Sequence, residues 1–240
     1  MRRLALVSSL LLVVSTPLFA WYYFTASNGQ RQQWVFGSSC NSGSRPITMI
    51  YDSDIQSLAA GYQTAITTVM TQWNAPTGGN LLCPTATCSP VSHQQTMTAS
   101  AVNNFLNSPT ANQIWMVWDT DGTVLRSVGV DPNSSVLGVG LGLNPNSSRP
   151  QDLCSGILIL NAPLILSSTT PAPTIRFQQV VLHEIGHVIG LAHSIAGNNM
   201  GTVTAATGPN LPVMFPFLFS NSPTTLNPDE TAGVRSIYAP

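Results

Sequence analysis

The sequence predicts an α+β domain. Short apolar runs suited to β-strands lie between polar and glycine-rich segments, and they indicate a sheet. Three longer segments repeat apolar residues every three or four positions, which is typical of helices that bury one face. Hydrophobic residues make up 43% of the 240-residue chain, so a core can be buried, and this length suits one domain better than two.

The first predicted elements are a strand and a helix. Residues 21–46 are a polar, Gly/Ser-rich lead-in, and residues 47–51 form a short apolar strand. Residues 52–54 contain two aspartates and a serine, which can cap a helix. Apolar residues then recur at helical spacing over residues 55–73, so we expect one amphipathic helix that packs on the sheet.

The middle of the chain supplies the remaining strands. Residues 113–118 and 156–160 are apolar runs of strand length. Residues 136–143 alternate Val or Leu with Gly, as an exposed or edge strand does. Asp119 and Asp121 belong to an Asp-Thr-Asp-Gly turn, whose carboxylates could also bind calcium, although the spacing is not that of an EF-hand.

Two further helices are predicted in the C-terminal third. The first covers residues 175–189 and stops at Gly190, a natural left-handed helix terminus. The second begins at Asn227, has Pro228 in its first turn and acidic residues at the positive end of its dipole, and runs to about Tyr238.

The N-terminus has the pattern of a secretory signal peptide over residues 1–20. Two arginines precede an uncharged apolar run from Leu4, and Ala20 is a small residue suited to a cleavage site. The uncharged run continues to Phe24, so the leader could extend to residue 26 or remain as a membrane anchor. Both alternatives place the rest of the chain outside the cytoplasm, and we expect a secreted protein.

Charge restricts the classes of partner. Charged residues make up 7% of the chain, against about 25% in average soluble proteins, and the net charge is −1. Such a chain lacks the basic surface that nucleic acids or acidic membranes require. We therefore expect no nucleic-acid partner, and membrane contact only if the N-terminal segment is retained as an anchor.

Four cysteines agree with an oxidising compartment. Cys83 and Cys88 lie five positions apart and can close a small surface loop, which leaves Cys40 and Cys154 as the other pair. Four cysteines allow three pairings, and the sequence does not choose among them.

The chemistry-bearing pattern is the run His-Glu-Ile-Gly-His-Val-Ile-Gly-Leu-Ala-His, from His183 to His193. On a helix, His183 and His187 lie one above the other on the same face. Gly190 then lets the backbone turn sharply, which brings His193 back to the same point. Three imidazoles on a tetrahedral metal leave one position open, and this is the arrangement of a catalytic zinc.

Glu184 follows the first histidine but is not a ligand. It can take a proton from a water at the open position, whose pKa the metal lowers, and deliver it to the leaving amine. The spacing therefore predicts one catalytic Zn²⁺ held by the three histidines, with Glu184 as general base.

These residues resemble the zinc-binding pattern of the metzincin metallopeptidases. Ser194, directly after the third histidine, resembles the matrixin branch, which includes the matrix metalloproteinases. Residues 213–216 (Val-Met-Phe-Pro) resemble the family's Met-turn, with Met214 as the apolar floor beneath the metal and Met200 as the alternative. Residues 226–238 resemble the terminal helix of matrixin catalytic domains.

The resemblance implies a zincin-like metzincin domain over residues 47–240. Its fold would be a twisted mixed sheet of about five strands with three helices, the active-site helix carrying the zinc motif. The pattern departs from the family in several places. Cys40 lacks the residues that surround a cysteine switch, and His93 alone cannot supply the second, structural zinc site of those enzymes.

The expected function is that of a secreted zinc-dependent endopeptidase. It would be a monomer that hydrolyses peptide bonds in a protein or peptide substrate, by means of a metal-activated water. The alternative is a secreted, zinc-bound, non-catalytic binding module of the same fold. Glu184 speaks against that alternative, because a binding module does not need a general base.

Overall fold

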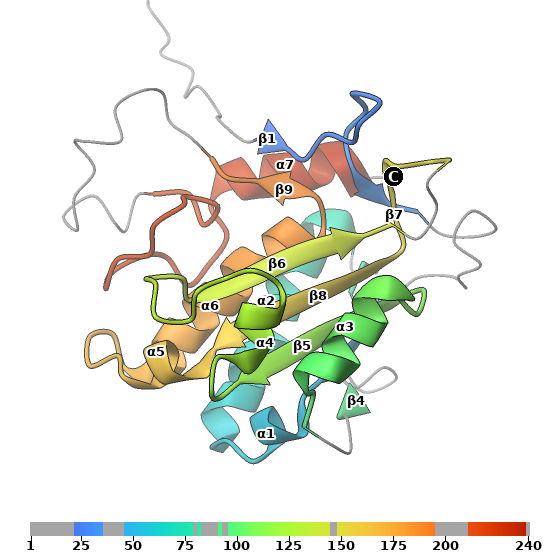
Figure 1. Cartoon of the computed structure of the whole chain (residues 1–240). Coiled ribbons are helices and arrows are strands. Elements are labelled where there is room, and N and C mark those ends of the chain that lie inside the picture. Colours follow the sequence, from blue (N-terminus) through green and yellow to red (C-terminus); the bar gives the residue numbers. More distant parts are fainter. Residues whose placement is uncertain are drawn as a thin grey trace, which may run out of the picture.

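The computed structural model describes residues 22–35, 46–78, 81–82, 91–92, 96–144, 148–194 and 211–238. At its centre lies a five-stranded sheet with the strand order β4-β3-β5-β8-β6 (Figure 1). Four strands run parallel: β3 (Thr48–Tyr51), β4 (Val91–Ser92), β5 (Gln113–Asp119) and β8 (Ser155–Asn161). The fifth strand, β6 (Gly138–Leu143), pairs antiparallel with β8 at the edge of the sheet. The mixed sheet and the edge position of the glycine-alternating strand agree with the sequence prediction.

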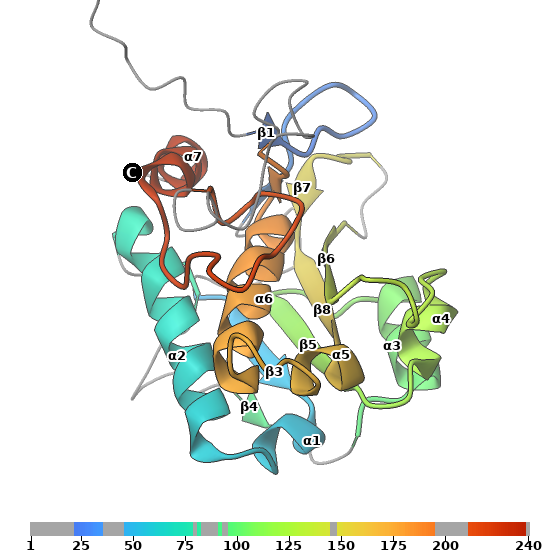
Figure 2. The same cartoon turned by 90° about the vertical axis from the view of Figure 1, so that its left-hand side faces the viewer.

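Helices cover both faces of this sheet. Figure 2 shows α2 (Ala60–Asn74) and α6 (Pro173–Val188) on one side, and α3 (Ala99–Asn107) and α4 (Thr123–Ser127) on the other. The interior strand β8 is buried on both faces. Its Leu158 and Leu160 pack in the larger core with α2 and α6, whereas Ile157 and Ile159 pack in the smaller core beneath α3 and α4. This explains why its sequence is a continuous apolar run rather than an alternating one.

The expectation of three helices was too low, because the described residues form seven. The helix expected over residues 55–73 is divided into α1 (Ser53–Gln56) and α2, with a break at residues 57–59. Helices α4 and α5 (Ala162–Leu166) have five residues each, too few to show a helical period. Helix α3 was missed because its run is rich in Ser and Asn, although Thr98 caps it by accepting a hydrogen bond from Ala101 N.

The segment expected to be a lead-in takes part in the fold. Strand β1 (Tyr22–Tyr23) pairs antiparallel with β9 (Leu191–Ala192), and β2 (Gln33–Trp34) pairs parallel with β7 (Asp152–Leu153). Figure 1 shows β1 and β9 beside the last helix, α7 (Pro228–Tyr238). The chain ahead of the sheet is therefore brought to the C-terminal end of α6.

Several predictions concern residues outside the described ranges. These are the leader at residues 1–20, together with Cys40, Cys83, Cys88, His93 and Met200. Cys154 is buried and disulfide-bonded, while the pairing stays a prediction. Within the described ranges, no helix is both long enough and apolar enough to cross a membrane.

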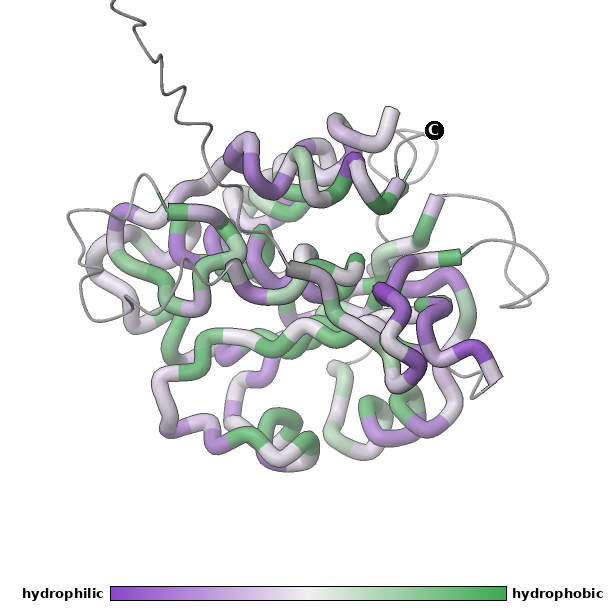
Figure 3. Tube along the Cα trace, turned by 90° about the horizontal axis from the view of Figure 1, so that it is seen from above, coloured by the Kyte–Doolittle hydropathy of each residue, from purple (hydrophilic) through white to green (hydrophobic). Residues whose placement is uncertain are grey.

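Hydrophobic and hydrophilic positions alternate along the chain in Figure 3, as expected of elements with one buried side.

Candidate metal centre

The site is built on the C-terminal half of α6. This helix starts with Pro173 in its first turn, where the missing N–H costs nothing, and its second half is buried throughout. It ends at Val188, and the chain turns at Gly190, which has φ = +101°. A Cβ at Gly190 would lie 2.7 Å from the carbonyl oxygen of Gln32, so both the dihedral angle and the space require glycine. The predicted helix stop is confirmed.

The turn brings three imidazole nitrogens together. The Nε2 atom of His187 lies 3.1 Å from Nε2 of His183 and 3.1 Å from Nε2 of His193, and the last two are 3.3 Å apart. Zinc–nitrogen bonds of about 2.0–2.1 Å in a tetrahedral site place two ligand nitrogens about 3.3 Å apart. The three histidines that the sequence predicted as ligands therefore fit a single ion of this size.

Hydrogen bonds on the far side of two rings fix which nitrogen faces the centre. Nδ1 of His183 donates to the carbonyl of Val213 at 2.7 Å, and Nδ1 of His187 donates to the carbonyl of Leu191 at 2.8 Å. A carbonyl oxygen carries no proton, so the proton of each neutral ring is on Nδ1 and the lone pair of Nε2 points inward. Lone pairs at this separation repel one another unless a cation lies among them, which is the arrangement of a metal site.

Burial keeps these ligands neutral. Loss of solvent, together with the neighbouring His187, lowers the pKa of His183 to about 3. Loss of solvent likewise lowers the pKa of His187 to about 4, and it lowers the pKa of the half-buried His193. A metal ligand must be deprotonated, so the first two rings are ready to bind a cation well below neutral pH.

Glu184 is buried beside this centre. Its side chain is 6% exposed, and burial raises its pKa to about 8, while a hydrogen bond from the backbone of Gly140 opposes the rise. A cation close to a carboxylate lowers its pKa. The carboxyl group of Glu184 is therefore placed to change its protonation state near neutral pH, as a general base and acid must.

Glycines on the edge strand allow this close approach. A Cβ at Gly138 would lie 3.1 Å from Oε1 of Glu184. A Cβ at Gly140 would come closer to the backbone carbonyl of Glu184 than real Cβ atoms come to any neighbour. The Val/Leu–Gly alternation that predicted an edge strand thus also brings β6 into contact with the backbone of α6.

A cleft of about 930 Å³ opens over the histidines. Residues 135–140, which lead into and begin β6, line one part of the cleft. Residues 216–218 and Phe24 line the rest of its rim. Phe24 and Phe217 are exposed, and the ring of Phe24 lies 5.5 Å from the ring of His187. The floor of the cleft carries His183, Glu184, His187 and His193.

Met214 lies against the zinc-motif helix. Its buried sulfur occupies the space that a Cβ on Gly186 would need, and Gly186 stands between the first two histidines on α6. The carbonyl of Met214 accepts a hydrogen bond from the backbone N–H of Ser194 at 2.8 Å. These contacts place Met214 against the helix that carries the first two histidines, and its assignment as the Met-turn methionine stays a prediction.

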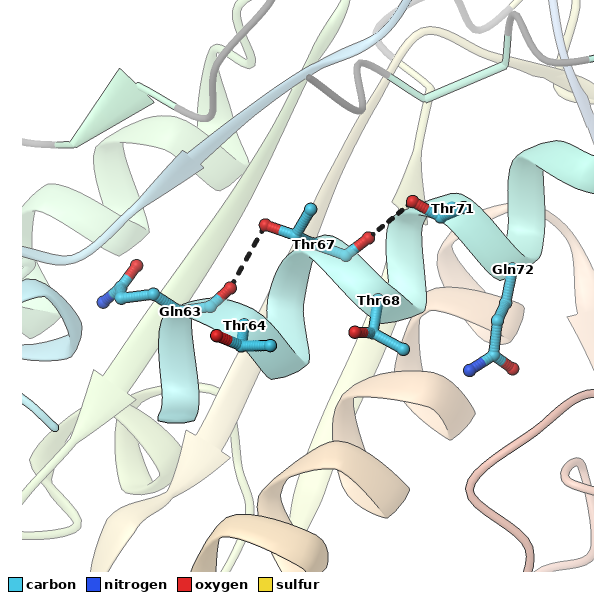
Figure 4. Close-up of a pocket in the computed structure, with 6 residues that line it drawn as sticks. All are labelled: Gln63, Thr64, Thr67, Thr68, Thr71 and Gln72. Atoms are coloured by element: carbon cyan, nitrogen blue, oxygen red, sulfur yellow. Dashed lines mark hydrogen bonds between the residues drawn. The ribbon is translucent and has the colours of Figure 1, made fainter. Parts of the chain in front are cut away.

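The carboxylates of Asp119 and Asp121 take part in a local turn. The carboxylate of Asp119 accepts hydrogen bonds from the backbone of Gly122 and Leu125, and that of Asp121 accepts one from Thr123, so they stabilise a turn before α4. Along the part of the chain that the structure describes, the three histidines are the one group with metal-ligand geometry. A second concavity follows the outer face of α2 (Figure 4), and it is lined by uncharged residues: Gln63, Thr64, Thr67, Thr68, Thr71 and Gln72.

Sequence reasoning missed one carboxylate that supports the site. Glu230 on α7 is buried, and burial raises its pKa to about 7. Its Oε2 accepts from the backbone N–H of Asn227 at 3.0 Å, and its Oε1 accepts from that of Met214 at 3.2 Å. The first bond is a capping-box contact, which the spacing Asn-Pro-Asp-Glu could have predicted. The second joins distant segments and has no local signal.

Comparisons with known proteins find a similar solved structure but no matching family. No family model matches the chain. No curated protein matches it either. Its fold is similar to the crystal structure of metalloproteinase-II from Bacteroides fragilis, with a TM-score of 0.43 and 12% sequence identity. The alignment covers 87% of this chain and 57% of that chain, so this chain spans little more than half the length of that protein.

Proposed function

We propose that this protein is a secreted, zinc-dependent endopeptidase of the metzincin type, with the matrixin-like features seen in its sequence. The observation that carries the proposal is the convergence of three Nε2 atoms within 3.3 Å, on the floor of an open cleft, beside a buried carboxyl group. A structural zinc site is closed by four protein ligands, whereas a set of three leaves room for a water or a substrate.

Each residue of the centre has one role in this proposal. His183, His187 and His193 would hold the ion, which when bound supplies Lewis-acid polarisation of a water and of the scissile carbonyl. Glu184 takes a proton from that water as general base and then delivers it to the leaving amine as general acid. The hydrogen bonds from His183 to Val213 and from His187 to Leu191 keep the two rings in the orientation that ligation needs.

The walls of the cleft favour a polypeptide substrate. Among the described residues, β8 is the one strand that pairs with β6, so the other edge of β6 is available to the backbone of an extended peptide. Phe217 and Leu218 also line the cleft and offer an apolar surface to a substrate side chain. We therefore expect cleavage of extended polypeptides with a preference for apolar side chains just after the scissile bond.

The proposal is tested with purified full-length protein on casein or gelatin. Wild type should hydrolyse the substrate, and a chelator should stop hydrolysis until zinc is restored. Glu184→Gln should lower turnover by about two orders of magnitude or more while zinc content stays near one per chain, because the carboxamide keeps the shape but takes no proton. His187→Ala should lose both zinc and turnover.

The same measurements separate the alternative function. A zinc-loaded wild type that binds substrate peptides but never cleaves them would favour a non-catalytic binding module. Unchanged turnover in Glu184→Gln would show that the assigned general base is wrong.

A further inference from the structure

At the C-terminal end of α6, beside the metal centre, backbone carbonyl groups need hydrogen-bond donors from outside the helix. The last four carbonyl groups of a helix have no partner within the helix, and such groups must find other donors when they are buried. Among the carbonyls at this end are that of Val188, the last residue of α6, and those of Ile189 and Gly190, which follow it immediately before the segment that carries His193. His193 is the one ligand of the three that does not stand on a helix.

Donors from distant parts of the chain form hydrogen bonds with these carbonyl groups. The indole Nε1 of Trp34 donates to the carbonyl of Val188 at 2.9 Å, and the hydroxyl of Tyr238 donates to the carbonyl of Ile189 at 2.6 Å. The backbone N–H of Phe24 donates to the carbonyl of Gly190 at 3.1 Å. The three consecutive carbonyls at the turn are thus each satisfied by another segment.

Trp34 and Tyr238 form one connected network. The backbone N–H of Trp34 donates to the hydroxyl oxygen of Tyr238 at 3.0 Å, so this hydroxyl links β2 to the end of α6. Both side chains are almost fully buried, at 4% and 3% exposed. An unmade hydrogen bond at such a place is costly, so the network favours one position of the turn.

We propose that Trp34 and Tyr238 are positioning residues for the third metal ligand. By holding the carbonyls of Val188 and Ile189, they fix the turn at Gly190 and therefore the direction from which His193 reaches the ion. This inference rests on the proposed metal site, and it adds residues from both ends of the chain that make no contact with the metal.

The hydroxyl of Tyr238 provides the sharpest test. Tyr238→Phe keeps the ring in its packing but leaves the carbonyl of Ile189 and the N–H of Trp34 without this partner. The turn then relaxes, and His193 is held less well. Groups that orient metal ligands from behind typically account for about 10- to 100-fold in metal affinity, so we expect zinc to bind at least about tenfold more weakly.

Ser155→Ala is the matched control. The Ser155 hydroxyl is buried on β8 and donates to the carbonyl of Thr110 at 2.6 Å, the same length as the Tyr238 bond. Its loss should lower stability by a similar amount without reaching the turn. Trp34→Phe, which removes the indole N–H, gives a second and independent variant.

The experiment measures zinc affinity by chelator competition and the visible absorption of the cobalt-substituted protein, in the full-length chain. We expect Tyr238→Phe and Trp34→Phe to bind zinc more weakly and to change the cobalt spectrum, while Ser155→Ala matches wild type. Wild-type affinity and spectrum in both variants would overturn the inference but leave the proposed function standing. Equal weakening in Ser155→Ala would also overturn it, since stability alone would then explain the effect. A wild type that binds no cation would contradict both proposals.

Discussion

At the scale of single residues, glycine has as large a part in the site as histidine. Gly190 gives the turn, Gly186 gives room to the sulfur of Met214, and Gly140 brings the edge strand against the backbone of Glu184. In each place the absence of a side chain sets the distance between two parts of the site. The glycines therefore determine where the reacting groups stand.

The variant Gly140→Ala tests whether a glycine sets the position of the general base, Glu184. The new methyl group must push the backbone of Glu184 away from β6, because no flexible side chain is there to yield. We expect kcat/KM to fall roughly ten- to a hundredfold, as a displaced catalytic group implies, with zinc content unchanged. Peptidase kinetics and metal analysis measure both quantities.

Gly61→Ala is the control for that variant. Its Cβ on the exposed side of α2 would meet only the side chain of Thr174, at 3.3 Å, and alanine is the better helix former. Activity should equal that of wild type. Full activity in Gly140→Ala would show that the contact between β6 and Glu184 does not position the base.

The three ligands and Glu184 could be predicted from the sequence because their spacing is local. A helical repeat and one glycine turn are enough to bring His183, His187 and His193 to one point. Trp34, Tyr238 and the second hydrogen bond of Glu230 could not be predicted in this way. Their partners are distant in the sequence, so no short pattern marks them.

At the scale of elements, α7 does more than close the domain. Glu230 caps its first turn and at the same time holds the backbone of Met214, which packs under the metal-binding stretch of α6. The pKa of Glu230 in the folded state, about 7, is above the ordinary 4.5. A raised pKa means that the folded state binds the proton more tightly than the unfolded chain does.

The direction of the pH effect follows from that difference. The contribution of Glu230 to stability is fully present below about pH 4.5 and is lost as the pH rises through about 7. Glu230→Gln does not titrate. We therefore expect the stability of wild type relative to this variant to fall between pH 4.5 and 7 and to stay level above that range. Urea denaturation of both proteins at several pH values measures it, and a pH-independent difference would contradict the assignment.

Some helices and strands could be predicted from the local sequence pattern alone. Strand β8, the edge strand β6 and helix α6 agree with their predicted positions, since each has a clear period or an unbroken apolar run. The break between α1 and α2 was not predicted, because the apolar spacing continues across residues 57–59 while the backbone does not.

At the scale of the whole molecule, both ends of the described chain meet at the end of α6. Strands β1 and β2 come from the N-terminal side and α7 from the C-terminal side, and each is hydrogen-bonded to residues around the turn at Gly190. Sequence patterns describe elements one at a time, so the predicted lead-in gave no sign of this convergence. The shape of the metal site therefore depends on the complete fold rather than on the motif alone.

The proposed route of secretion concerns this same N-terminal segment. If residues 1–20 are a cleaved leader, secreted protein should begin at Trp21, just ahead of β1. N-terminal sequencing of protein collected from the medium gives the answer. Protein that stays with the membrane fraction and begins within the first residues would support the retained anchor instead.

The central claim is that three imidazoles share one zinc ion and leave a coordination position open beside Glu184. X-ray absorption at the zinc edge of the purified protein tests it most directly. We expect one zinc ion per chain with three imidazole nitrogens at about 2.0–2.1 Å, an additional oxygen and no sulfur. Sulfur at the metal, fewer than three imidazoles, or protein that is fully folded and cannot take up zinc would contradict the account.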